Sequence, residues 1–168
     1  VLPVEYDYIG KMSEDLIVAK RGSVYGCFDK TGTLVVPMEY DEIREFVGGM
    51  ARIRIYGKLG FINASGDVVV APFSDEVENF SEGCCLVTMR NKVGLVNLQG
   101  DWIAAPMYED GGSFSAGYAY LAQKGKYGYI DNSGEFVIPM KYSKAKSFNP
   151  VNKLACVTEG DKWGVIDV

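Results

Sequence analysis

The chain repeats itself about every 34 residues, and this period constrains its fold more than any other feature of the sequence. The glycine intervals are 34, 34, 34 and 36 residues, the extra two falling just after Phe148. The series are Gly26, Gly60, Gly94, Gly128 and Gly164; Pro3, Pro37, Pro72, Pro106 and Pro139; and Met12, Phe46, Phe80, Phe114 and Phe148. Three series with one period predict five copies of a single structural unit.

One unit, residues 117–139, contains three segments with the pattern of short β-strands. We predict these strands over residues 118–122, 127–131 and 135–138. A turn centred on Gly125 joins the first two strands. Asp131 can bond to the backbone of the following turn, and Gly134 can adopt a positive φ there. Pro139 is expected to end the third strand, because it has no N–H to donate.

No segment has a sustained helical period, so the sequence predicts an all-β protein of five tandem three-stranded units. The third strands read "LVV", "VVV", "WIA" and "FVI" and are apolar on both faces. A sheet that is wet on one side would alternate instead. Each unit is therefore expected to pack against a neighbour on both faces, within one domain that spans residues 1–168.

Two architectures satisfy this repeat. The chain begins with "VLPVEYD", which has the pattern of a third strand, and ends with "KWGVIDV", which has that of a second strand. Pairing of the two ends would complete a fifth unit and close a five-bladed, propeller-like ring, which is the arrangement we expect. An open β-solenoid stack is the alternative, and it would need protected ends.

Composition excludes several classes of function. The net charge of −5 with no basic stripe argues against nucleic acid as a partner. The absence of histidine removes the commonest general base and the commonest nitrogen ligand for metals, and the four cysteines form no CxxC pair. We therefore expect no catalysis, cofactor or metal. The sequence contains no run of about 18 apolar residues, so we expect no transmembrane helix. A secreted or cell-surface bacterial location is favoured over the cytoplasm.

The motifs "KWGVID", "KYGYIDNSGEFVIPMKY" and "VYGCFDKTGTLVVPMEYD" resemble the bacterial WG-repeat (KWG) family over essentially the whole chain. The tryptophan of the motif is present only at Trp163, and its other copies hold Tyr25, Leu59, Val93 and Tyr127. The aspartate that follows the second strand is Asp29, Asp131 and Asp167, with Asn63 and Asn97 in the other copies. The resemblance implies an all-β repeat scaffold and, by analogy, a role in interaction.

Acidic residues gather in the loops that follow the prolines. The eight residues after each proline hold 11 of the 22 acids, and they include Glu39, Asp41, Glu42, Asp75, Glu76, Glu109 and Asp110. The fifth loop instead holds Lys141, Lys144 and Lys146. Equivalent loops lie on one rim in either architecture. That rim is either a docking surface for a cationic partner or a set of solvated loops.

Aromatic and basic residues occupy a second variable place. Tyr118 and Tyr120 lie on the outward face of a first strand, where Arg52 and Arg54 fall in another repeat. Aromatic rings beside polar groups suit peptide or sugar binding, whereas their structural role would be packing between units. The leading hypothesis is a non-catalytic scaffold that binds a protein or peptide through the variable loops of one rim. The alternative is a glycan or small-molecule binding module with sites between repeats.

Overall fold

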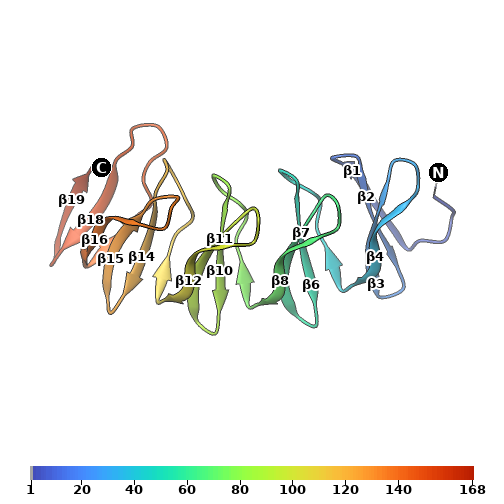
Figure 1. The fold of residues 1–168 in the computed structure, drawn as a ribbon, viewed down its shortest axis with the longest axis horizontal. Helices are drawn as coiled ribbons and strands as arrows, with labels where there is room; N and C mark the ends of the chain where they lie inside the picture. Colours follow the sequence, from blue (N-terminus) through green and yellow to red (C-terminus); the bar gives the residue numbers. More distant parts are fainter. Residues whose placement is uncertain (1) are drawn as a thin grey trace. The chain divides into compact units, whose positions relative to one another are not determined.

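Five small antiparallel sheets follow one another along the chain in the computed structural model, which describes residues 2–168 (Figure 1). The described residues contain no helix, which confirms the all-β class. Residues 2–7 form no strand. Val1, the first residue of the segment predicted to pair with the chain's end, lies outside the described residues, and the pairing of the two ends stays a prediction.

The strands have the following bounds. The first sheet contains β1 (Tyr8–Ser13), β2 (Leu16–Arg21), β3 (Val24–Asp29) and β4 (Leu34–Tyr40). The second contains β5 (Glu42–Ile43), β6 (Met50–Ile55), β7 (Lys58–Asn63) and β8 (Val68–Ser74). The third contains β9 (Glu76–Val77), β10 (Cys84–Met89), β11 (Lys92–Asn97) and β12 (Trp102–Tyr108). The fourth contains β13 (Asp110–Gly111), β14 (Ala119–Gln123), β15 (Lys126–Ile130) and β16 (Phe136–Tyr142), and the fifth β17 (Lys144–Ala145), β18 (Ala155–Glu159) and β19 (Lys162–Ile166).

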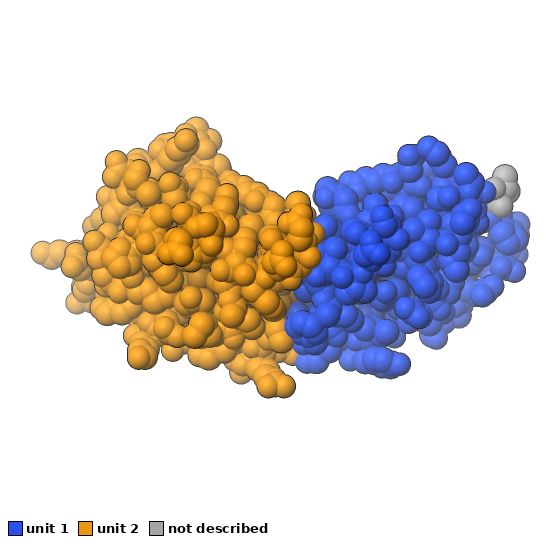
Figure 2. Space-filling view, in the orientation of Figure 1, with its two compact units in different colours: residues 1–74 blue, residues 75–168 orange. Residues whose placement is uncertain are grey.

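The chain divides into two compact units, residues 1–74 and residues 75–168, which Figure 2 shows in different colours. The first unit holds the first two sheets, and the second unit holds the other three. Each unit therefore contains at least two consecutive repeats.

The expectation of three strands per sheet was wrong for four of the five sheets, which have four strands. The added strand comes from the loop after the proline and pairs with the first strand of the next repeat. In the fourth sheet, for example, Asp110 of β13 pairs with Ala122 of β14. The backbone groups at the edge of a first strand need partners. The added strands β5, β9, β13 and β17 have only two residues each, which is too few to show a side-chain period in the sequence. In the first sheet the six-residue strand β1 takes their place.

The sequence predicted that Pro139 ends the third strand. This prediction was wrong, since β16 continues past Pro139 to Tyr142. The pairs Tyr127↔Tyr142 and Tyr129↔Ile138 span two residues on β15 but four on β16. The extra residues form a bulge, and Pro139 lies in it. A proline is tolerated in a bulge because the ladder hydrogen bond that it cannot donate is already interrupted there.

The recurrent glycine is explained by the same bulge. A Cβ atom placed on Gly128 would lie 2.6 Å from the carbonyl oxygen of Ile138. At Gly26 and Gly94 the corresponding distance to a third-strand carbonyl is 2.7 Å, and Gly60 meets the carbonyl of Val70 in the same way. None of these glycines has a positive φ. Glycine is required here because the third-strand backbone approaches too closely for any side chain.

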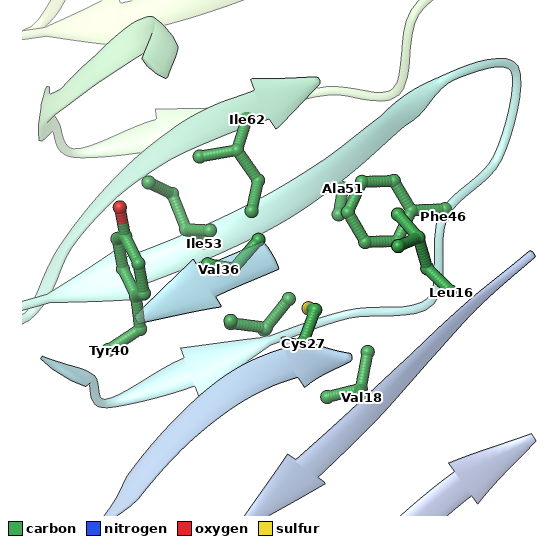
Figure 3. Close-up of a cluster of buried hydrophobic side chains, with 10 residues drawn as sticks. Leu16, Val18, Cys27, Val36, Tyr40, Phe46, Ala51, Ile53 and Ile62 are labelled. Carbon is green, nitrogen blue, oxygen red and sulfur yellow. The ribbon is translucent and has the colours of Figure 1, made fainter. Parts of the chain in front are cut away.

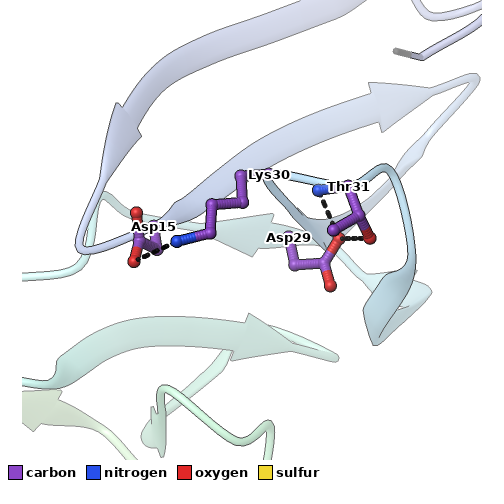
Figure 4. A network of polar contacts seen from close by, with 4 residues as sticks. All are labelled: Asp15, Asp29, Lys30 and Thr31. Atoms are coloured by element: carbon purple, nitrogen blue, oxygen red, sulfur yellow. Dashed lines mark hydrogen bonds and ion pairs between the residues drawn. The ribbon is translucent and has the colours of Figure 1, made fainter.

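The turn between the second and third strands is built by the recurrent Asp or Asn, as predicted. Asp29 accepts hydrogen bonds from the N–H groups of Thr31 (2.9 Å) and Thr33 (2.8 Å) and from the Thr31 hydroxyl (2.6 Å; Figure 4). Lys30, beside them, forms an ion pair with Asp15 at 3.2 Å (Figure 4). In the fourth repeat Gly134 has a φ of 85°, which confirms the predicted positive φ.

The second strands, not the third, are buried on both faces. β3, β7, β11 and β15 each carry consecutive buried residues, whereas the third strands lie at sheet edges with large apolar side chains partly exposed. Figure 3 shows one core cluster, in which side chains of the first sheet pack against side chains of the second. Phe46, a member of the periodic series, lies in this cluster and is buried. Within a unit, consecutive sheets therefore pack face to face, as expected.

Serine hydroxyls hold the periodic phenylalanines in place. Ser13 donates to the carbonyl of Phe46 at 2.6 Å, and Ser115 donates to that of Phe148, also at 2.6 Å. Each serine belongs to the repeat before the phenylalanine, so each bond joins two consecutive repeats. Directional bonds of this kind set the spacing between sheets that apolar packing alone would leave loose.

We predict that Gly128→Ala lowers the free energy of unfolding by about 1–3 kcal/mol, because its Cβ would force the third-strand backbone away. Urea denaturation measures this change. Lys126→Ala is the control: it changes an exposed residue on the same strand and should stay within about 0.5 kcal/mol of the unmodified chain. Equal stability of the two variants would contradict the steric explanation.

Candidate interaction surface

One cross-strand pair occupies the same place in every sheet yet changes its chemistry from repeat to repeat. One member of the pair is the residue that begins the short added strand (β5, β9, β13 or β17), or β1 in the first sheet. The other member lies opposite it on the adjacent strand, which is β2, β6, β10, β14 or β18. We call this set the variable row; its pairs are Tyr8/Lys20, Glu42/Arg54, Glu76/Thr88, Asp110/Ala122 and Lys144/Thr158. Constant backbone with variable side chains is typical of a scaffold that presents different groups for recognition.

In the second sheet the variable row is an ion-paired cluster. Arg54 lies 3.0 Å from the Glu42 carboxylate, and Arg44 forms a second ion pair with the same carboxylate. The Glu42 side chain is 24% exposed, less than either arginine. Arg52 is half-buried on the same strand as Arg54. The structure thus brings together two predicted candidates, Glu42 and Arg54, and adds Arg44, which the sequence had not indicated.

In the fourth sheet Asp110 of the variable row forms an aromatic–carboxylate cluster with the neighbouring Tyr120 and Tyr127. The Tyr127 hydroxyl donates to Asp110 at 2.8 Å, and the Tyr120 and Tyr127 ring centroids lie 6.0 Å apart. Gly112 lies directly against the Tyr120 ring, where any Cβ would clash. Burial, together with the hydrogen bond and charge of Asp110, raises the pKa of Tyr127 to about 12. The sequence had identified all three groups without placing Tyr127 beside Asp110.

Several predicted docking acids have a structural role in the hairpin between the first and second strands. Asp75 accepts a hydrogen bond from the backbone N–H of Arg90 at 2.7 Å. Glu109 does the same for Gly125 at 3.2 Å, and the bonds from Gly125 and Lys124 hold the pKa of Glu109 below its usual value. These acids therefore recur for a reason of backbone geometry. Glu39, Asp41 and Glu76 are exposed candidates from the same loops.

The other predicted aromatic residue, Tyr118, packs inward. Its ring lies 5.2 Å from that of Phe148, and it belongs to the core cluster of the fourth and fifth repeats. Tyr120 contributes to the same cluster and is half-buried. The two tyrosines predicted to face outward therefore both contact the core, and Tyr120 also lies in the aromatic–carboxylate cluster around Asp110.

The basic loop of the fifth repeat places lysines over aromatic rings. The ammonium of Lys146 lies 5.5 Å from the Trp163 ring centre, and that of Lys141 lies 5.0 Å from the Tyr142 ring centre. Cation–π contacts of this kind hold the lysine side chains without neutralising their charge. Lys144 occupies the variable row of this sheet.

The cysteines are free thiols. Burial raises the pKa of Cys27 and of Cys85 to about 12, so neither is a reactive thiolate at neutral pH. Across residues 2–168 the structure brings together no group of three or more Cys, Asp or Glu side chains suited to a metal ion. Nor does this part of the chain form a helix that is long and apolar enough to cross a membrane.

Five tandem antiparallel sheets, each built from one recurring sequence pattern, define an all-β tandem-repeat protein. The family model described as "WG containing repeat" matches residues 25–58, 60–92, 94–127 and 127–163. The chain therefore belongs to the WG-repeat family. None of the curated proteins compared with it matches significantly.

Several solved structures share a distant likeness with the chain. A eukaryotic initiation factor is 12% identical, with a TM-score of 0.49, and the likeness covers 95% of this chain and 51% of that one. PorZ of Porphyromonas gingivalis is 14% identical, with a TM-score of 0.38 and coverages of 97% and 27%. Hsv2p of Kluyveromyces lactis is 9% identical, with a TM-score of 0.45 and coverages of 96% and 60%. The chain thus spans about half or less of the first two proteins, and likenesses at this level establish no shared function.

We predict that Tyr127 ionises at a higher pH than an ordinary tyrosine and that Asp110→Asn lowers its pKa. Because the folded-state pKa of Tyr127 is raised from 10.0 to about 12, its contribution to stability is complete below pH 10. That contribution is lost as the pH rises from 10 towards 12. Tyrosinate absorbance of the unmodified chain minus that of Tyr127→Phe isolates the group. An unchanged pKa in Asp110→Asn would show that Asp110 does not perturb Tyr127.

Proposed function

We propose that this protein is a non-catalytic scaffold that binds a protein or peptide partner through the variable row and its adjoining loops. The observation that carries the proposal is chemical variation on a constant backbone. The row places an ion pair at Glu42 and Arg54 in one repeat, and in another it places Asp110, which accepts a hydrogen bond from Tyr127 of the adjacent second strand. The residues that build the fold recur instead in nearly every copy.

Exposed charge in the row and its adjoining loops favours a partner that carries complementary charge. Glu76 of the row is exposed, and so are Glu39 and Asp41 of an adjoining loop. Exposed charges of one sign accelerate encounter with a partner of the opposite sign and are screened by salt. The fifth repeat, with its lysines, adds a region of opposite charge to the same kind of surface.

The non-catalytic character of the proposal is supported by the residue types available. The chain has no histidine, so neither a Ser-His nor a Cys-His pair can form. The acids that recur at the hairpins bind backbone N–H groups, and this holds the pKa of Glu109 low rather than high. A general acid would need the opposite shift.

The proposal includes a propeller-like arrangement in which residues 2–6 complete the fifth sheet beside β19. Residues 2–6 have the pattern of a third strand, with Tyr6 three residues after Pro3, as Tyr142 follows Pro139. On the first sheet Ile9 and Met12 are exposed apolar side chains that a neighbouring sheet could cover. Closure of this kind would remove a sheet edge.

Spin labels at Val4 and Asp167, in a chain with Cys156→Ser, test ring closure. A closed ring predicts one narrow and short interlabel distance, because the two sites would lie on neighbouring strands. The distance should not change on dilution with unlabelled chain, which separates pairing within one chain from pairing between chains. A broad distribution of long distances would contradict closure.

A photo-crosslinking amino acid at Glu76 tests the binding function. In cells that express the native full-length protein, we expect it to capture a defined protein partner. The same amino acid at Gln99 is the control, because Gln99 is exposed in the turn at the opposite end of the same sheet. Capture should also fall at least about tenfold when Glu39, Asp41 and Asp110 are all replaced by lysine.

Equal capture from Glu76 and from Gln99 would argue against the variable row as the binding surface.

The glycan alternative makes a different prediction that rests on the Tyr120–Tyr127–Asp110 cluster. Binding of the unmodified chain to a glycan array would favour that alternative if it is lost in Tyr120→Ala and kept when only Glu39 and Asp41 are replaced by lysine, because that double variant leaves Asp110 in place.

A further inference from the structure

Two backbone positions at the variable row carry basic side chains in several repeats, and we call them the cation positions. The first lies two residues after the start of a short added strand, and its N–H bonds to a carbonyl of the adjacent first strand. It is Arg44, Glu78, Gly112 and Lys146 in the second to fifth sheets. The second lies on the first strand, opposite the residue that precedes the recurrent glycine. It is Lys20, Arg54, Thr88, Ala122 and Thr158 in the five sheets.

In the second sheet both cation positions are basic, and both contact the same carboxylate. Arg44 and Arg54 each form an ion pair with Glu42, the residue that begins β5. Glu42 takes the place that Asp110 has in the fourth sheet, because each lies opposite the second cation position. A basic side chain at either position can therefore reach the carboxylate of the row.

In the first and fifth sheets a basic residue at a cation position lies over an aromatic ring. The ammonium of Lys20 lies 5.4 Å from the Tyr25 ring centre, and that of Lys146 lies 5.5 Å from the Trp163 ring centre. These rings take the place that Tyr127 has in the fourth sheet, directly before the recurrent glycine. In three of the five described sheets the chain thus places a cation of its own against an acid or a ring.

The fourth sheet has both an acid and a ring, but neither of its cation positions is basic. Asp110 is the acid, and Tyr127 is the ring. The cation positions are Gly112 and Ala122. Within the part of the chain that the structure describes, Asp110 forms no ion pair and Tyr127 forms no cation–π contact. The fourth sheet therefore presents the two acceptors that other sheets satisfy internally.

Tyr120 explains why the fourth sheet cannot supply a cation from the first position. A Cβ atom on Gly112 would lie 2.3 Å from a carbon of the Tyr120 ring, so no side chain fits there. At the second position Ala122 is buried and carries no polar group. A cation that reaches this surface therefore has to come from another molecule.

A second carboxylate, from the preceding repeat, adds to the negative charge of this surface. Glu78 accepts a hydrogen bond from the Ser113 hydroxyl at 2.5 Å. Burial, followed by the negative charges of Asp110 and Glu78, raises the pKa of Tyr120. Both carboxylates are exposed, and the tyrosine rings beside them are half-buried. Aromatic rings flanked by two carboxylates favour a cation over a neutral sugar.

We propose that the aromatic–carboxylate cluster, together with Glu78, is a subsite for an arginine side chain of the protein partner. This inference rests on the proposed function, because it names the group that one part of the variable surface receives. A guanidinium is flat, so it can stack on a tyrosine ring while its N–H groups donate to a carboxylate. Asp110 accepts bonds from Tyr127 and Gly111, and an ionised carboxylate has about four lone-pair sites, so further acceptor capacity remains.

Amide NMR of the full chain tests the subsite with two small probes. One is acetyl-arginine methylamide; the other is its citrulline counterpart, which has nearly the same shape and no charge. We expect saturable shifts with the arginine probe at the amides of residues 110–113 and of Tyr120, and none with the citrulline probe. The amides of residues 42–44 are an internal control that should not shift, because Glu42 is already paired with two arginines of its own chain.

Asp110→Asn and Glu78→Gln remove one charge each with little change of shape. Each should raise the Kd of the arginine probe at least about threefold, and the double variant at least about tenfold. Glu135→Gln is the matched control, since it changes the net charge equally at an exposed residue of the same repeat. It should leave the Kd unchanged. The remaining amide signals show whether each variant keeps its fold.

Absence of saturable shifts at residues 110–113 would overturn the proposal. Equal binding of the two probes would do the same, as would an affinity that is indifferent to both charge-removing variants. An acetyl-lysine methylamide probe, its side-chain ammonium free, that binds as tightly as the arginine probe would overturn the choice of arginine.

The photo-crosslinking experiment at Glu76 reports on the proposed function separately. Capture of a partner from Glu76 without shifts near Asp110 would remove the arginine subsite alone. Shifts near Asp110 without capture would support the subsite and argue against the proposed function.

Discussion

The carbonyl of each complete third strand approaches the second strand so closely that only glycine fits between them. This contact occurs at Gly26, Gly60, Gly94 and Gly128. It allows a bulge of two extra residues, and the bulge accommodates proline within a paired strand. Beyond the bulge the chain can reach the next repeat and pair there as a short strand. The link from one sheet to the next therefore depends on the absence of one Cβ atom.

Because each sheet is small, its second strand must be covered on both faces. The periodic phenylalanines supply much of that cover, and hydroxyls such as that of Ser115 bond to their carbonyls. Cover on both faces leaves little freedom at these positions. Variation is confined to the loops and to the variable row, where side chains reach solvent. A repeat protein of this design can change what it binds without changing how it folds.

Much of the fold could be predicted from the sequence, because its strongest signals are local. The hairpin turn at Asp131 and Gly134 depends on residues within four positions of one another, and the structure confirms it. Pro139 was misread because proline usually ends a strand, and only the register with β15 shows that it lies in a bulge. The short strands such as β13 were missed because two residues carry no period and pair with a partner ten or more residues away.

For the candidate surface too, the sequence determined some features and the tertiary structure determined others. The sequence by itself determined the five repeats, the residues that recur in them and the acidic, basic and aromatic residues that vary. Only the tertiary structure decided which of these meet: Tyr127 bonds to Asp110, 17 residues away, and Arg54 pairs with Glu42. It also decided that the carboxylates of Asp75 and Glu109 accept hydrogen bonds from backbone N–H groups of the hairpin turns. The physical reason is register, since bulges and cross-strand pairing set which side chains are neighbours, and neither is encoded in a short stretch of sequence.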